Sequence, residues 1–286
     1  DSSNNWQWPN YIQTSRKEDL RVCLTINLTA QHINQVVNSV RENKPSTKVL
    51  PVDDYADKDT AEILGGLIRN IENDSDADTA YDIAFEHAVV GGEGFWIINT
   101  EYESETSCNQ VIRVKPCINP QLVYIDIDAI SPDKSDAEWG FIFEDMKKET
   151  FKRLYPDVKN ATSWTVDRDS KWVTDDTIRT ALYFYLEYKP DVALLLEDGS
   201  AVLKSNLDDG VELDGDTLKK PDGSTIRILK KRDTSRKQWM RCKIVGGHDE
   251  PIELEKWPGA YLPIVRVVGK EFNIDGQLVI KGETRD

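Results

Sequence analysis

The chain has 286 residues, of which 39% are apolar and 30% charged, with a formal net charge of −15 at pH 7. This length is sufficient for one large or two medium domains with a buried core. No run approaches the roughly 20 apolar residues that cross a bilayer, so a transmembrane helix is not expected. Proteins that bind DNA over their whole surface usually carry a net positive charge, so the negative net charge of this chain argues against that class.

The first third of the sequence predicts three helices. Residues 30–40 have apolar side chains at helical spacing, and Thr29 precedes them as the expected N-cap. A second helix is expected at residues 58–73, which carry a broad apolar face. A third is expected at residues 77–90, where the pair Gly91-Gly92 would end it.

From residue 95 the pattern changes to short β-branched or aromatic runs between polar loops, which is typical of strands. These runs lie at residues 95–98, 111–115, 122–125, 139–143, 181–188, 193–196, 201–203, 225–230, 238–245 and 261–268. A short helix is expected at residues 147–155, and Asp198-Gly199 predicts a hairpin turn. The predicted fold class is α+β, with N-terminal helices followed by a mixed, mainly antiparallel sheet.

Two neighbouring regions of the sequence carry opposite charge. Residues 187–216 contain nine acidic side chains, and residues 227–243 contain eight basic ones. The basic block consists of Arg227, Lys230, Lys231, Arg232, Arg236, Lys237, Arg241 and Lys243. Its candidate partner, the acidic block, consists of Asp208, Asp209, Glu212, Asp214 and Asp216. Either the blocks are solvated hairpin faces, or the basic block meets DNA or the acidic block of a neighbouring subunit.

The sequence Asp126-Ile-Asp128 follows an apolar run and offers an alternative function. Two carboxylates at a strand end can hold Mg²⁺ or Mn²⁺ against a diphosphate, as in a metal-dependent nucleotide-sugar transferase. No nucleotide-binding motif precedes this pair. Strand alternation would place Asp126 and Asp128 on the same face, which suits a solvated edge equally well.

Other candidate motifs point to structure rather than chemistry. Asp74 to Asp78 resembles the start of a calcium loop but lacks the glycine and glutamate that the loop requires, so helix capping is expected. Gly91 to Gly94 follows a helix instead of preceding one, which favours a helix stop over a phosphate loop. His32, His87 and His248 lack partners at metal-binding spacing. We therefore expect no enzymatic activity, catalytic residue, cofactor or metal. A carbohydrate-binding module, suggested by eight tryptophans, is a weaker alternative because scattered tryptophans more often pack in cores.

Three segments in order, residues 21–45, 61–75 and 84–96, resemble portal proteins of short-tailed phages. In that family a helix ends in an Asn-Lys-Pro turn, an Ala-Glu-rich helix follows, and a third helix breaks at Gly-x-Gly before a strand. Residues 118–126 and 263–276 are also similar to the family, whereas residues 159–249 are matched weakly.

The resemblance implies a subunit of a dodecameric ring at one capsid vertex, the passage for viral DNA packaging and ejection. It implies contacts with terminase, scaffolding, coat and tail adaptor proteins, and weak, non-specific contact with duplex DNA in the channel. The expected location is the virion, with host cytoplasm during assembly, and no membrane partner. Residues 1–94 would be the helical part of the wing and residues 95–286 its β-rich part, ending before the stem helix. The stem, clip and crown would then be absent.

Overall fold

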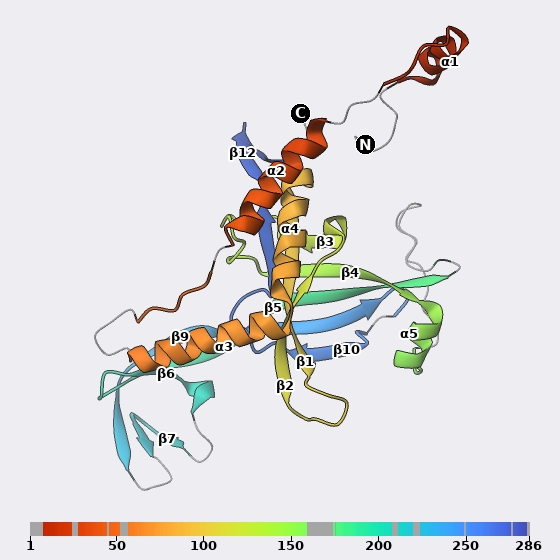
Figure 1. Cartoon of the computed structure of the whole chain (residues 1–286). Coiled ribbons are helices and arrows are strands. Elements are labelled where there is room, and N and C mark those ends of the chain that lie inside the picture. The colour runs from red at the N-terminus through yellow and green to blue at the C-terminus, as the bar shows by residue number, and fades with distance from the viewer. Residues whose placement is uncertain are drawn as a thin grey trace. The chain divides into compact units, whose positions relative to one another are not determined.

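The computed structural model describes residues 8–24, 28–44, 46–51, 57–158, 174, 176–207, 211–219, 224–248, 250–275 and 277–284 (Figure 1). The helices are α1 (Asn10–Glu18), α2 (Leu28–Glu42), α3 (Lys58–Asp74), α4 (Ala77–Gly91) and α5 (Lys148–Leu154). No helix among these residues is long and apolar enough to cross a membrane.

The strands outnumber the helices and are paired antiparallel. They are β1 (Glu93–Tyr102), β2 (Gln110–Pro116), β3 (Val123–Ile125), β4 (Trp139–Lys147), β5 (Thr177–Leu196), β6 (Ala201–Leu203), β7 (Glu212–Asp214), β8 (Thr217–Lys219), β9 (Thr225–Val245), β10 (Glu253–Lys256), β11 (Ile264–Val268), β12 (Lys270–Ile274) and β13 (Gln277–Lys281). The α+β class expected from the sequence is confirmed.

The chain divides into two units, residues 1–137 with 263–286, and residues 138–262. This division does not follow residues 94 and 95, where helices give way to strands. The assignment of residues 1–94 and 95–286 to two parts of a wing stays a prediction.

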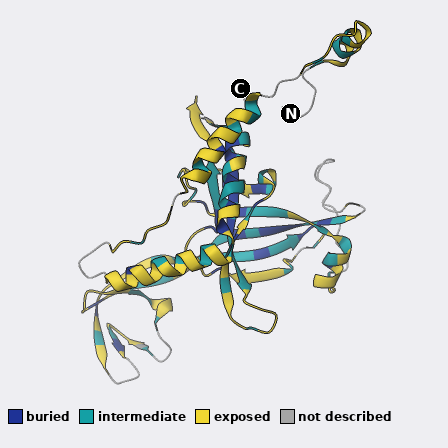
Figure 2. Ribbon diagram, viewed as in Figure 1, coloured by how far each residue is buried: buried dark blue, intermediate teal, exposed yellow. Residues whose placement is uncertain are grey.

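The first unit is built on a three-stranded sheet in the order β11-β1-β2. Helix α4 packs on this sheet through small side chains, and Ala77, Ala80, Ala84 and Ala88 are buried at helical spacing. Figure 2 shows buried residues along α4, whereas most of α3 is exposed. The helix and β1 approach so closely that a Cβ on Gly94 would lie 1.9 Å from the Ala84 carbonyl oxygen.

Residues 269–284 donate hydrogen bonds to carbonyl groups at the C-terminal end of α4. Gly92 ends the helix with a φ of 102°, a conformation that glycine adopts without strain. The backbone N–H of Gly269 donates to the Gly92 carbonyl at 2.8 Å, and that of Glu283 donates to Val89 at 2.7 Å. The Thr284 hydroxyl donates to the Val90 carbonyl at 2.5 Å. Carbonyls that a helix end leaves without helical partners are therefore satisfied by tertiary contacts.

The second unit is built on β5, which pairs with β4 on one edge and β9 on the other. β6 adds to the outer part of β5, β10 pairs with β9, and β8 joins β9 to β7. The Phe184 side chain of β5 is fully buried. A hydrophobic cluster packs Phe151 of α5 against Ile178 of β5 and Val245 of β9.

The expected helices at 58–73 and 77–90 and the hairpin at Asp198-Gly199 are confirmed. The expected N-cap Thr29 is wrong, because α2 already begins at Leu28. The strands expected at 181–188 and 193–196 form one continuous strand, β5, and those at 225–230 and 238–245 form β9. Their polar middle segments pair with each other in register, so neither strand breaks there.

Several elements were not expected from the sequence. These are α1, β7, β8, β10, β12 and β13. They are short, and α1 has no buried residue while β10 and β12 are exposed throughout. Such segments carry little of the apolar periodicity on which sequence-based expectations depend.

Candidate functional site: a charged ribbon of β5 and β9

The oppositely charged regions meet on one antiparallel ribbon (Figure 1). β5 pairs with β9 from Thr180 opposite Val245 to Leu196 opposite Ile228, with a register shift after Leu195. The basic block therefore lies along β9, and the first part of the acidic region lies beside it on β5. Strand pairing brings the two regions side by side within a single chain, although no acidic residue lies directly opposite a basic one in the register.

The end of the ribbon at Leu196 has a small core of its own. Leu194 and Leu196 of β5 pack with Leu218 of β8 and Ile228 of β9. This cluster holds the turn between β7 and β8 against β9. The Lys231 ammonium consequently lies 2.8 Å from an oxygen of Asp216 and donates to the Gly215 carbonyl at 2.6 Å.

Three members of the basic block have carboxylate partners in the same chain. Besides Lys231 with Asp216, Arg241 lies 3.9 Å from Glu255, and Lys243 lies 3.3 Å from Glu144. These ion pairs partly neutralise the three cations within the chain itself.

Lys243 belongs to a half-buried network that ties α5 to the sheet. Its side chain is only 13% exposed, and its ammonium lies 5.8 Å from the centre of the Tyr155 ring. The Tyr155 hydroxyl donates to Glu253 at 3.1 Å. Burial lowers the pKa of Lys243, but the Glu144 carboxylate and Tyr155 outweigh it, so the pKa is raised from its ordinary value. Lys243 is thus a structural cation.

The exposed members of the basic block lie mainly toward the end of the ribbon that holds the small core. They are Arg227, Lys230, Lys231, Arg232 and Lys237, of which Lys231 is paired with Asp216. The Lys237 ammonium lies 5.5 Å from the centre of the Tyr188 ring. Arg236 is half-buried, and its guanidinium donates to the Ser205 hydroxyl at 3.4 Å. Only part of the basic block therefore presents its charge to solvent.

Two members of the acidic block have partners within the chain. The Lys219 ammonium donates to Asp214 at 2.5 Å, and this hydrogen bond lowers the pKa of Asp214. The hydrogen bond from Lys231 likewise lowers the pKa of Asp216. Asp208 and Asp209, and the side chain of Glu212, lie outside the described residues. Asp191, on β5, accepts a hydrogen bond from the Ser205 hydroxyl at 2.5 Å, which lowers its pKa.

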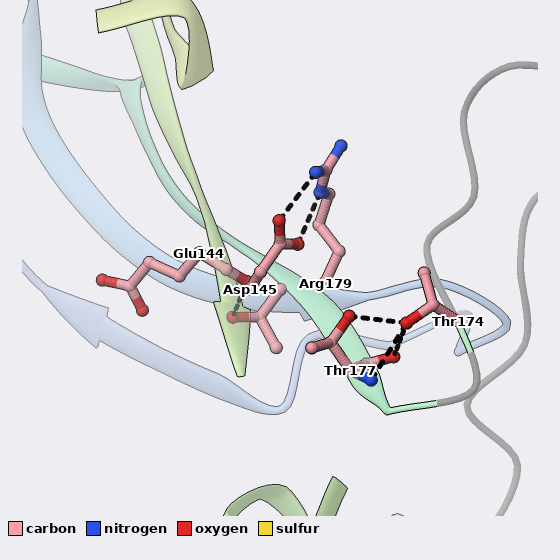
Figure 3. Close-up of polar contacts among 6 residues, drawn as sticks. Glu144, Asp145, Thr174, Thr177 and Arg179 are labelled. Atoms are coloured by element: carbon pink, nitrogen blue, oxygen red, sulfur yellow. Dashed lines mark hydrogen bonds and ion pairs between the residues drawn. The ribbon is translucent and has the colours of Figure 1, made fainter. Parts of the chain in front are cut away.

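The other end of the ribbon carries an ion pair that sequence reasoning missed. The Arg179 guanidinium of β5 donates two hydrogen bonds, of 2.7 and 2.8 Å, to the Asp145 carboxylate of β4 (Figure 3). The two residues lie directly opposite each other in register, which brings the guanidinium and the carboxylate within reach of a two-bond contact. The hydrogen bonds from Arg179 hold the pKa of Asp145 below its usual range. Nearby, Thr174 and Thr177 are hydrogen-bonded at the start of β5 (Figure 3).

The structure gives Asp126 and Asp128 different environments. Asp126 is buried and Asp128 is exposed, so the expectation that both lie on one face is wrong. They follow β3 in a turn, where the Asp126 carboxylate accepts a hydrogen bond from the Asp128 N–H at 3.1 Å. No group of three His, Cys, Asp or Glu side chains that could hold a metal occurs in the described part of the chain. The transferase alternative gains no support.

Of the two remaining motifs, the glycines have the role expected of them and the aspartates only in part. Asp76 occupies the N-cap position of α4, but its side chain forms no capping hydrogen bond with a backbone N–H; its carboxylate instead accepts from the Thr79 hydroxyl at 2.7 Å. Gly92 ends α4, and Gly94 allows the helix and β1 to approach.

Comparison with known proteins gives this arrangement a context. The sequence profile of the phage P22-like portal proteins matches residues 2–286. The chain belongs to this family. A portal protein of Acyrthosiphon pisum secondary endosymbiont phage 1 is 27% identical over 257 residues. That match covers 87% of this chain and 35% of the relative, so the chain spans about a third of the relative's length.

Membership of the P22-like portal family agrees with a candidate site that consists of charged side chains rather than catalytic groups. Portal proteins are structural proteins, and the ribbon offers exposed cations beside carboxylates that already have partners. The family also accounts for the resemblance of residues 21–45, 61–75 and 84–96, which form or flank α2, α3 and α4.

Proposed function

We propose that this chain is the wing portion of a portal subunit without enzymatic activity. Twelve such subunits would form a ring at one capsid vertex, the passage for DNA packaging and ejection. The observation that carries the proposal is the family match over residues 2–286. In this proposal the wing comprises the helical residues 1–94 together with the β-rich residues 95–286.

The partners follow from this role. The ring is a platform for terminase, scaffolding, coat and tail adaptor proteins, in the host cytoplasm during assembly and then in the virion. Duplex DNA in the channel is a weak and non-specific partner, because a chain of net charge −15 repels phosphate over most of its surface. The exposed cations Arg227, Lys230, Arg232 and Lys237 are the proposed points of contact.

Electron microscopy of the full-length subunit tests the ring. Head-to-tail contacts between identical subunits close into a cyclic ring, and we expect twelvefold particles with an axial opening. A small dimer with twofold symmetry as the largest closed assembly would contradict the proposal, because a twofold contact cannot generate such a ring.

A further inference from the structure

The edge of β9 that faces away from β5 is paired only near its two ends. β8 pairs with β9 up to Arg227, and β10 pairs with it from Met240 onward. Between these strands, no residue in the part of the chain that the structure describes forms a backbone hydrogen bond with this edge of residues 229–238. At about 3.3 Å per residue, the unpaired stretch is about 33 Å long. We call residues 229–238 the open edge of β9.

A hydrogen bond beside the open edge shows which of its backbone groups point outward. The Trp257 N–H donates to the Trp239 carbonyl at 2.8 Å, from the side of β9 that faces away from β5. Alternate residues of a strand direct their N–H and C=O groups to the same side. The outward groups of the open edge therefore belong to Lys231, Asp233, Ser235 and Lys237.

The corresponding edge of β5 is closed to a further strand by a proline. The Leu186 N–H donates to the Glu138 carbonyl at 2.9 Å, on the side of β5 that faces away from β9. By the same alternation, the backbone of Pro190 points to that side, where it has no N–H to donate. Pro190 lies directly opposite Ser235 in the register. One edge of the ribbon thus lacks a donor at the position where the other edge presents one.

The side chains around the open edge carry a net positive charge. The open edge itself has one carboxylate, Asp233, and five cations, Lys230, Lys231, Arg232, Arg236 and Lys237. The facing part of β5 adds Lys189, Glu187 and Asp191, and the turn between β7 and β8 adds Asp216. Six cations and four carboxylates therefore surround this edge, in a chain whose net charge is −15. No residue of the open edge is buried.

Backbone pairing and charge together favour an acidic peptide over DNA. An added strand both accepts from outward N–H groups and donates to outward carbonyls. Phosphate groups of DNA accept hydrogen bonds but do not donate them, so they would leave the outward carbonyls unpaired. Lysines along a strand edge also discourage the addition of neutral or basic strands. The class of strand that this edge admits is therefore acidic.

We propose that the open edge of β9 binds an extended, acidic segment of another protein, which adds to the sheet between β8 and β10. The two short acidic strands of this chain, β7 and β10, have three and four residues and would leave most of the open edge unpaired. A partner protein therefore fits this edge better than a second copy of the chain. The contact goes beyond the proposed function and does not require the ring.

Fluorescence anisotropy of a defined peptide on the full chain tests the contact. The probe is a fluorescein-labelled peptide of five Glu-Val repeats, because valine favours strands and this length matches the open edge. We expect saturable binding. A peptide of five Glu-Pro repeats keeps the charge but lacks alternate N–H groups, so it should bind about tenfold more weakly or not at all. Equal affinity for the two peptides would overturn the proposal, because binding would then depend on charge alone.

One substitution separates strand addition from charge. Ser235→Pro removes an outward N–H without altering any charge, and it reproduces on β9 the proline that closes the edge of β5. It should weaken binding of the Glu-Val peptide about tenfold or more and leave binding of a ten-nucleotide thymidine oligomer unchanged. Ser235→Val keeps the N–H and is the matched control, which should bind the peptide like the parent chain. Unchanged peptide affinity in a folded Ser235→Pro chain would contradict strand addition.

Amide hydrogen exchange of the parent chain gives a readout that requires no substitution. With the Glu-Val peptide present, exchange measured by NMR should slow about tenfold or more at the outward residues Lys231, Asp233, Ser235 and Lys237. The residues between them already bond to β5 and should exchange as before. Protection confined to another segment, or absent altogether, would refute the contact.

Two further outcomes would overturn the assignment of the partner. Tighter binding of the thymidine oligomer than of the Glu-Val peptide would identify a nucleic acid as the ligand of this edge. Self-association of the chain that Ser235→Pro abolishes would identify a second copy as the occupant. Twelvefold rings of the full-length subunit that do not bind the peptide would refute this contact and leave the proposed function standing.

Discussion

The backbone N–H of Glu283 donates a 2.7 Å hydrogen bond to the carbonyl oxygen of Val89. It joins the end of α4 to a residue from the far end of the chain. Gly282 makes this possible, because a Cβ at that position would lie 2.3 Å from the Val90 carbonyl oxygen. The packing of residues 269–284 on α4 thus depends on the absence of a side chain.

Replacing this glycine tests that relationship. Gly282→Ala should lower the free energy of unfolding by about 1–3 kcal/mol, because a backbone must shift to admit the methyl group. The matched control is Gly66→Ala within α3, where an added Cβ meets nothing within 4 Å. That change should leave stability unchanged or raise it by up to about 1 kcal/mol. Urea denaturation of both variants measures the difference, and equal midpoints would contradict the close packing at Gly282.

The ion pair between Asp145 and Arg179 predicts a pH effect. Because the folded-state pKa of Asp145 is lowered by Arg179, its contribution to stability is present above the unfolded-state value of about 3.9. It is lost as the pH falls through the folded-state pKa. Asp145→Asn should therefore lower unfolding free energy at pH 7 by less than about 1 kcal/mol, since both side chains are partly solvated.

The difference between this variant and the parent chain should shrink as the pH falls below about 4. Asp157→Asn, at an exposed carboxylate of the same unit, is the matched control. A difference in unfolding free energy between the parent chain and Asp145→Asn that stays constant from pH 7 to pH 3 would speak against the ion pair.

DNA binding should depend on the exposed cations of β9 and not on the cations that are paired within the chain. Duplex binding is expected to be weak and to fall steeply with salt. Changing Lys230, Arg232 and Lys237 to Gln should reduce both the affinity and the salt slope, whereas Lys243→Gln should leave both unchanged because that cation is paired with Glu144. Fluorescence anisotropy across a salt series measures this. Nanomolar, sequence-specific binding would overturn the channel interpretation.

Pairing of the two charge blocks between neighbouring subunits stays a prediction. If the basic block meets a neighbour's acidic block, changing Lys230, Lys231 and Arg232 to Glu should slow ring assembly by the full-length subunit. Changing Asp208, Asp209 and Glu212 to Lys should then restore it, because the coupling is pairwise. Light scattering follows the assembly. Failure of this rescue, with both single sets folded, leaves the blocks as solvated faces, where exposed pairs contribute about 0–1 kcal/mol each.

Features encoded by near neighbours in the chain were determined by the sequence alone. The apolar periodicity of residues 58–73 and the glycines after residue 90 predict α3 and α4, because helix formation and helix ends depend on residues a few positions apart. The Asp198-Gly199 hairpin is local in the same sense. The family resemblance of residues 21–45 also needed no structure.

Contacts between distant residues were decided only by the tertiary structure. β5 and β9 run unbroken through polar stretches because each supplies the other's backbone partners across the ribbon. Folding places Lys231 beside Asp216 of the turn between β7 and β8, and Lys243 beside Glu144 of β4, whereas Lys230 forms no ion pair with the residues that the structure describes. These lysines are alike in sequence. Their roles differ because the tertiary structure, and not the spacing along the chain, determines which carboxylate lies close to each lysine.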